Sequence, residues 1–118
     1  MNRDLHNNVE VLEAIAPATL DDDNTPAAVD LQGAEAAELI IHIGAGGITF
    51  SGTNKIEFKL THSDDDSTYT AVDADDMQGV ASVGTGGIIK SLISAHASAT
   101  VSKFGYVGGK RYLKLLAD

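Results

Sequence analysis

The chain has 118 residues, of which 43% are hydrophobic, and this length suits one domain with a single core. It contains no cysteine, which excludes disulfides, thiolate metal ligands and thiol nucleophiles. No apolar run reaches the roughly 20 residues that span a bilayer, and no apolar stretch follows Arg3, so we expect neither a membrane span nor a secretory signal.

The formal net charge of −9 is distributed unevenly along the chain. Residues 1–76 hold 16 acidic residues against three basic ones, whereas residues 77–118 hold five basic residues against one acidic one. Because duplex affinity comes mainly from neutralised phosphates, the acidic part argues against a nucleic-acid partner. The basic tail fits an acidic partner surface, but the simpler interpretation is that its lysines solvate outward strand faces.

The first 20 residues are either an N-terminal arm or an edge strand. The apolar residues between Val9 and Ile15 fit no single face, although the alternation at Val9 favours a strand that Pro17 ends. Residues 21–26 are turn-forming and give the arm a hinge. We expect the arm to dock onto another subunit; the alternative is an edge strand of the chain's own sandwich, with only residues 1–8 loose.

Residues 21–118 are expected to form the folded domain, and its strands begin with two short alternating runs. Residues 28–31 predict a short strand. Residues 37–43 predict a stronger one, with Leu39, Ile41 and Ile43 on one face and Ile40 and His42 on the other. A glycine-rich loop follows, and another short element begins at Ile48.

Residues 55–62 show the clearest alternation in the chain. Ile56, Phe58 and Leu60 are expected to point inward, while the residues between them point outward. The aspartate-rich turn 63–67 then leads into 68–72, which predicts a hairpin.

The last third of the chain predicts strands at 88–92, 99–106 and 111–115, with the final two forming a second hairpin around the turn 107–110. Seven or eight short strands with frequent turns indicate an all-β, single-domain antiparallel β-sandwich, jelly-roll-like in form. Alternation assigns the core to Ile41, Ile43, Ile56, Phe58, Leu60, Val101, Leu113 and Leu115.

Several nucleotide and metal motifs begin in the sequence but are incomplete. The glycine pairs at 44–46 and 84–86 lack the third glycine of a dinucleotide fingerprint, since Thr49 and Ile89 occupy its place. The acidic run 73–76 lacks the further ligand and the glycine of a calcium loop. No two histidines have metal-ligand spacing. We therefore expect no catalytic residues, no cofactor and no metal, and a protein that is not an enzyme.

Six segments, in order along nearly the whole chain, resemble a family of small structural proteins from tailed phages, prophages and gene transfer agents. They are 1–5, 7–9, 16–18, 29–33, Leu-Thr-His-Ser-Asp-Asp-Asp-Ser-Thr-Tyr-Thr at 60–70, and Gly-Tyr-Val-Gly-Gly-Lys-Arg-Tyr at 105–112. The chain departs from the family pattern in a longer, glycine-rich middle at 44–54 and 82–99, where partner specificity would reside.

The resemblance implies a virion structural protein of the head-spike-base or head-decoration type, assembled in the bacterial cytoplasm and located on the capsid surface. Its partners would be the capsid protein and a spike fibre protein, and it would be a homo-oligomer, a pentamer if it sits at a five-fold vertex. Neither a nucleic acid nor a membrane is an expected partner. The candidate partner contacts are Asn2, Arg3, Leu5, Val9, Lys110 and Arg111.

Two alternatives remain open. One is a carbohydrate-binding β-sandwich module, for which Tyr69, Tyr106 and Tyr112 are the only plausible stacking platforms in a chain without tryptophan. The other is a head–tail connector or tail component, which keeps the structural class and changes the location in the particle.

Overall fold

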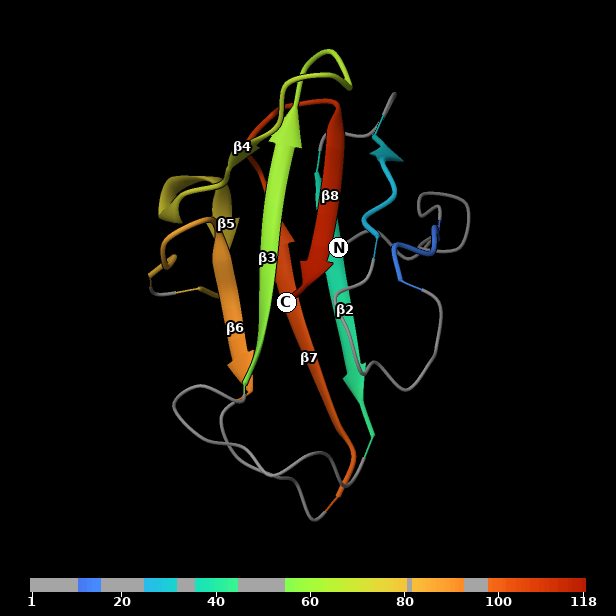
Figure 1. Ribbon diagram of the computed structural model, residues 1–118, viewed down its shortest axis with the longest axis vertical. Helices are drawn as coiled ribbons and strands as arrows, with labels where there is room; N and C mark the ends of the chain where they lie inside the picture. The colour runs from blue at the N-terminus through green and yellow to red at the C-terminus, as the bar shows by residue number, and fades with distance from the viewer. Residues whose placement is uncertain (1–10, 16–24, 32–35, 45–54, 81, 93–97) are drawn as a thin grey trace, which may run out of the picture.

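The computed structural model describes residues 11–15, 25–31, 36–44, 55–80, 82–92 and 98–118, and in these ranges the chain forms two antiparallel sheets packed face to face (Figure 1). The elements are β1 (Val29–Asp30), β2 (Ala37–Ile43), β3 (Ile56–Ser63), β4 (Thr70–Ala71), the 3₁₀ turn η2 (Ala74–Asp76), β5 (Met77–Gln78), β6 (Ile88–Leu92), β7 (Thr100–Tyr106) and β8 (Tyr112–Ala117). The predicted all-β sandwich is confirmed.

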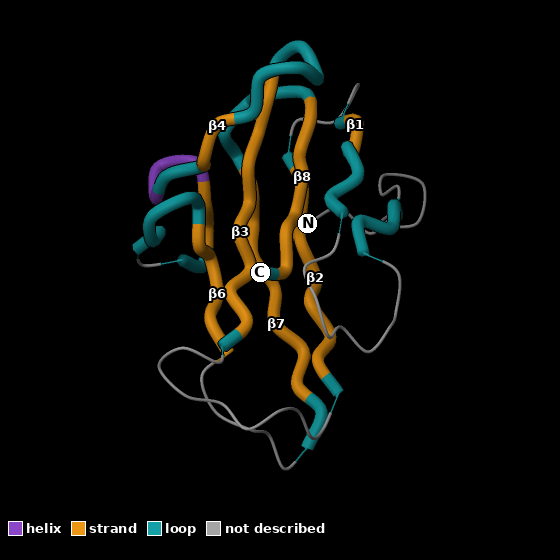
Figure 2. Tube along the Cα trace, viewed as in Figure 1, coloured by secondary structure: helices purple, strands orange, loops and turns teal. Residues whose placement is uncertain are grey.

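The strand order of both sheets follows from one nested pattern (Figure 2). In the first sheet β8 lies between β1 and β3, and β3 pairs on its other side with β4 and β6; in the second sheet β7 lies between β2 and β5. Strand β1 thus pairs with β8, β2 with β7 and β3 with β6. These nested pairs correspond to one long antiparallel hairpin that is folded over to form two sheets. This nesting is the pairing of a jelly roll, which the sequence predicted.

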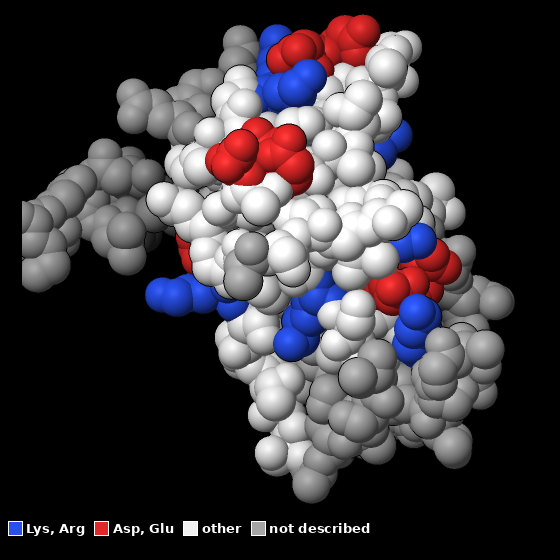
Figure 3. All heavy atoms as spheres, turned by 90° about the vertical axis from the view of Figure 1, so that its left-hand side faces the viewer, with Lys and Arg blue, Asp and Glu red and all other residues white. Residues whose placement is uncertain are grey.

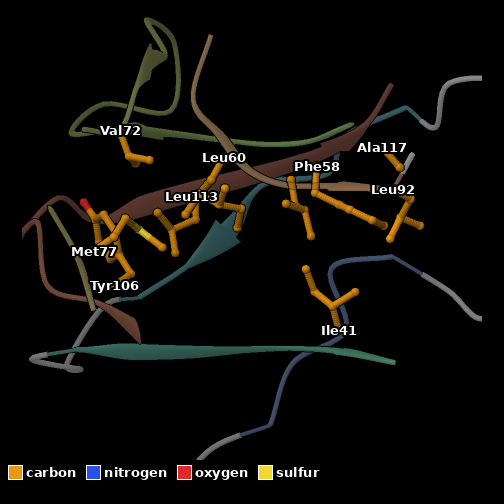
Figure 4. Packing of buried hydrophobic residues seen from close by; sticks show 11 residues of the cluster. Ile41, Phe58, Leu60, Val72, Met77, Leu92, Tyr106, Leu113 and Ala117 are labelled. Atoms are coloured by element: carbon orange, nitrogen blue, oxygen red, sulfur yellow. The ribbon is translucent and has the colours of Figure 1, made fainter. Parts of the chain in front are cut away.

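Side chains from both sheets fill the space between the layers (Figure 4). Strand β3 carries the predicted alternation, because Phe58 and Leu60 are buried while the intervening residues face outward. Strand β2 contributes Ile41 from the opposite layer. Among the described residues, the buried hydrophobic cluster comprises Ile41, Phe58, Leu60, Val72, Met77, Ile89, Leu92, Tyr106, Leu113, Leu115 and Ala117. Ile43 and Ile56, both predicted core residues, are partly buried against it.

The assignment of Val101 to the core was wrong, since 66% of this residue is exposed. A strand can bury only one alternating set of residues. In β7 the buried set is the one that contains Phe104 and Tyr106, which places Val101 on the outer face. The two aromatic rings remove far more apolar surface from water than a valine would, so they decide the orientation of the strand.

The predicted second hairpin was also wrong. Although β7 and β8 follow one another along the chain, β7 pairs with β2 and β5, and β8 pairs with β1 and β3. The turn between them therefore crosses from one sheet to the other. No strand was predicted at 77–78, where β5 lies, because a strand of only two residues has too few positions to show alternation.

Part of the N-terminal region lies outside the described residues. Residues 11–15 contain no strand, in contrast to the predicted continuation from Val9; Val11 is exposed, and Ile15 packs against the core. Residues 1–10 and 16–24, and with them most of the predicted arm, lie outside the description, as does the element predicted to begin at Ile48.

Candidate interaction site

Three of the six segments singled out in the sequence meet, through their described residues, at one end of the sandwich. Tyr112 in β8 is the register partner of Asp30 in β1 on one side and of Ser63 in β3 on the other. These residues belong to segments 29–33, 105–112 and 60–70. The β3–β4 turn and the β7–β8 turn lie above this row and form the surface that we call the turn end.

The β3–β4 turn is fixed by a cluster of hydrogen bonds around Asp65. One carboxylate oxygen, Oδ1, accepts from the Ser63 hydroxyl at 2.8 Å and from the backbone N–H groups of Ser67 and Thr68, both at 3.0 Å. The Ser63 hydroxyl oxygen in turn accepts from the N–H groups of Asp65 and Asp66. The N–H of Thr68, the Ser63 hydroxyl and the N–H of Ser67 stabilise the carboxylate and lower the pKa of Asp65 to about 2.

Asp66 completes this turn in a conformation that few residues adopt. Its φ is +58°, a left-handed value that aspartate and asparagine tolerate better than most side chains. Its carboxylate also accepts a hydrogen bond from the Tyr69 hydroxyl, so the side chain ties both halves of the turn together. Burial and this hydrogen bond raise the pKa of Tyr69 to about 12. Asp66 and Tyr69 therefore give the tip of the turn a defined shape.

The β7–β8 turn is anchored by a polar chain inside the sandwich. The Tyr106 hydroxyl oxygen lies 2.8 Å from Nδ1 of His62 and accepts the backbone N–H of Lys110 at 3.1 Å. Both bonds are satisfied when the Tyr106 O–H donates to a neutral His62 whose proton is on Nε2. Burial lowers the pKa of His62 and raises the pKa of Tyr106, which keeps both groups neutral.

The acidic segment after β4 supports the same turn. Asp73 and Asp76 form a reciprocal capping box around η2, and the Asp76 carbonyl accepts the backbone N–H of Val107 at 2.7 Å. An added Cβ on Gly108 would lie 2.7 Å from the Tyr106 hydroxyl and 2.8 Å from the Asp76 carboxylate, so only glycine fits there. These acids therefore order a turn of the chain.

Two ion pairs link the segments at the surface of the turn end. Arg111 holds Asp30 with two bonds of 2.8 and 2.9 Å, and Lys110 Nζ lies 3.4 Å from Asp64. Basic and acidic side chains lie against one another at this end of the molecule (Figure 3). The surface therefore presents paired charges of both signs, with no uniform field.

The structure brings two of the predicted partner contacts together and leaves four undescribed. Lys110 and Arg111 share the β7–β8 turn, and each is paired with an acid of the chain itself. Asn2, Arg3, Leu5 and Val9 lie outside the described residues. Sequence reasoning missed Asp30, Asp64 and Asp65 as parts of this surface. All three lie in segments that the sequence analysis had singled out, 29–33 and 60–70.

The three tyrosines considered as sugar-stacking platforms lie in different surroundings. Tyr106 is 1% exposed and belongs to the core, so its ring is not available at the surface. The Lys114 ammonium lies 4.3 Å from the centre of the Tyr69 ring, and the Arg111 guanidinium lies 5.0 Å from that of Tyr112. In each of these two cation–π contacts the cation lies over one face of the ring.

Within the described ranges, no group of three or more His, Asp or Glu side chains could hold a metal ion. The described residues also include no helix long and apolar enough to cross a membrane. What the turn end offers chemically is an ordered set of hydrogen-bonding groups and paired charges, which suits it to contact with another macromolecule.

Comparisons with known proteins give no relative for this chain. No protein-family model, no curated protein and no solved structure matches it.

Proposed function

We propose that the protein is a structural component of a phage-like particle, located on the capsid surface as a head spike base or decoration protein that mounts a fibre. One observation supports the proposal most strongly. Separate segments chosen for their resemblance to such proteins, 29–33, 60–70 and 105–112, come together in one row through Asp30, Tyr112 and Ser63. Turns that lie together at one end of a sandwich are common places for contact with a partner, because loops tolerate change that the core does not.

The construction of the turn end suits an adaptor. Its two turns are held by the Asp65 cluster and by the Tyr106 hydroxyl, so little conformational entropy would be lost on binding. Lys110 and Arg111 can exchange an intramolecular acid for one on a partner with little net loss, because exposed ion pairs contribute only about 0–1 kcal/mol. The turn end is therefore proposed as the face that meets the capsid or the fibre.

The first test is the composition of particles. Particles purified from cells that express the protein should contain it in several copies each by quantitative mass spectrometry. Electron microscopy with a labelled copy then distinguishes a vertex or capsid-face position from the neck of a head–tail connector. Particles that lack the protein altogether would rule out the proposed function.

The second test addresses the turn end with a matched pair of charge reversals. Lys110 has a side chain 35% exposed and an ion pair of 3.4 Å with Asp64; Lys55 has a side chain 37% exposed and an ion pair of 3.5 Å with Glu57. K110E and K55E should therefore cost similar, small amounts of stability. Incorporation should be lost in K110E and R111E and kept in K55E. Equal incorporation of all three variants would remove the turn end as the contact face while leaving the particle location intact.

The N-terminal arm provides a separate test of assembly. Deletion of residues 1–8 removes Asn2, Arg3 and Leu5, three of the predicted partner contacts. The truncated protein should melt at the same temperature as the full chain and should fail to enter particles. Normal incorporation would show that the arm is not an assembly element.

A further inference from the structure

Among the described strands, β2 lies at one edge of the smaller sheet (Figure 1). All seven of its residues pair with β7 on one side, and on the other side its backbone makes no hydrogen bond within the part of the chain that the structure describes. Edge strands are normally protected by lysine, proline, a bulge or short length. β2 has a continuous register over seven residues, and its sequence Ala-Glu-Leu-Ile-Ile-His-Ile contains no lysine or proline, with Glu38 as its one charged residue.

The outer face of β2 is a short, regular pattern of polar and apolar side chains. Glu38, Ile40 and His42 all point outward, and Ile40, in the middle, is 70% exposed. The neighbouring strand adds Val101, which is 66% exposed and pairs with His42. If two copies of this strand lie antiparallel, Glu38 of one opposes His42 of the other and Ile40 opposes Ile40. The outer face of β2 is therefore complementary to itself.

We propose that a second copy of the chain pairs with this edge, with β2 antiparallel to β2 of the partner about a two-fold axis at Ile40. The two small sheets then join into one six-stranded sheet with the order β5-β7-β2-β2-β7-β5. Ile40 faces Ile40 of the partner subunit at the axis. Glu38 faces His42 of the partner subunit, and the symmetry repeats this pair on the other side of the axis.

The register follows from the alternation of faces and from charge. In an antiparallel pair the side chains of opposed residues lie on the same face of the sheet, so outward residues must oppose outward residues. The two-fold axis can therefore pass through a residue of β2 but not midway between two residues. A centre at Leu39 or Ile41 would place Glu38 or His42 against Ile40 and would shorten the overlap. The centre at Ile40 overlaps all seven residues and forms two carboxylate–imidazole contacts, which stabilise directly opposed positions.

This surface is separate from the turn end, and the inference does not depend on the proposed function. A dimer formed through β2 leaves Lys110 and Arg111, in the β7–β8 turn, available for another partner. It also covers an apolar edge that would otherwise invite non-specific strand addition.

The absence of native cysteines permits a direct test of the register. Opposed Cα atoms in antiparallel strands are about 4.5–5.5 Å apart, within the range that a disulfide spans. Under mild oxidation with copper phenanthroline, I40C should give a cross-linked dimer. H42C alone should not cross-link, because the residue opposite it is Glu38 of the partner subunit. A mixture of E38C and H42C should cross-link again. All three positions are exposed, so the core is unchanged.

Charge exchange tests the same contact without covalent chemistry. By sedimentation velocity, the wild-type chain should shift from its monomer mass of 12.3 kDa toward twice that value as concentration rises. H42E alone, with Glu opposite Glu, should dissociate at least about tenfold more readily, and E38K should also be weakened. Mixing E38K with H42E should restore a dimer, since each lysine and each histidine then faces a glutamate.

The outcomes separate cleanly. The proposal is supported if I40C cross-links while H42C alone does not, if E38C mixed with H42C cross-links, and if E38K mixed with H42E forms a dimer. A wild-type chain that stays monomeric at high concentration would mean that the edge serves another chain or none, and overturns it. Cross-linking of H42C alone as fast as I40C would overturn the register at Ile40.

Discussion

The phenol oxygen of Tyr106 lies 2.8 Å from Nδ1 of His62, with the two rings edge to face at an interplanar angle of 79°. Tyr106 ends β7 in the smaller sheet, and His62 lies near the end of β3 in the larger one. This hydrogen bond therefore joins the two layers within the buried core. Because Tyr106 also accepts the N–H of Lys110, it connects the core to the turn end.

The His62–Tyr106 contact predicts that stability falls as the pH falls below the ordinary pKa of 6.5. Burial lowers the pKa of His62 in the folded chain, so the unfolded chain takes up a proton first as the pH drops. The stabilisation that neutral His62 contributes is complete above pH 6.5 and is lost progressively as the pH falls below that value. H62N keeps an acceptor oxygen and cannot be protonated in this range, so its melting temperature should decline less between about pH 7.5 and 5. Parallel pH profiles for the two proteins would contradict the prediction.

Removing the Tyr106 hydroxyl should leave two buried polar groups without a partner. Y106F deprives both His62 Nδ1 and the Lys110 N–H of their bonds, and we expect a loss of about 1–3 kcal/mol in chemical denaturation. Y112F is the control, because the Tyr112 hydroxyl makes no hydrogen bond within the described residues. An equal effect of the two substitutions would show that the buried bond contributes little.

Phe58 and Val101 test the assignment of the core. F58A removes a buried ring between the sheets and should cost about 3–5 kcal/mol, a large share of the stability of a small domain. V101A changes a residue that is mostly exposed and should shift stability by no more than about 0.5 kcal/mol. Denaturant titration measures both, and a large loss in V101A would place Val101 back in the core.

Gly86 and Gly87 are adjacent glycines with the same backbone requirement and different surroundings. Their φ angles are +81° and +90°, so alanine at either position is strained by about 1–2 kcal/mol. A Cβ at Gly87 would lie 2.3 Å from the Leu60 carbonyl oxygen, whereas one at Gly86 would come no closer than 3.7 Å to the Lys59 side chain. G87A should therefore lower the melting temperature much more than G86A. Similar melting temperatures would show that the β3 backbone can move aside.

The acid sensitivity of the turn end should depend on Asp65. Its pKa of about 2 lies below the ordinary value of 3.8, so its contribution to stability is present above 3.8 and is lost as the pH falls toward 2. D65N retains an acceptor oxygen but no titratable charge. Wild type should melt higher than D65N at neutral pH, and the difference should shrink in acid; a constant difference would indicate that the carboxylate charge is not involved.

Local pattern was sufficient to predict most of the strands. The alternation in β2 and β3 reflects a side-chain period of two, which depends only on a few consecutive residues and on one buried face. The glycine and aspartate runs between them likewise mark turns by their own backbone preferences. The segments that form the turn end could also be chosen from the sequence, although nothing in it showed that they meet.

The sequence by itself determined the all-β sandwich class, the faces of β2 and β3 and the lack of thiol chemistry. Only the tertiary structure decided that β8 joins β3 while β7 joins β2, that Val101 faces outward, and that Tyr106 reaches His62. The reason is physical. Alternation fixes which side chains share a face, but the choice of face and of partner strand depends on which distant side chains fill the common core, and in β7 the larger rings of Phe104 and Tyr106 prevail.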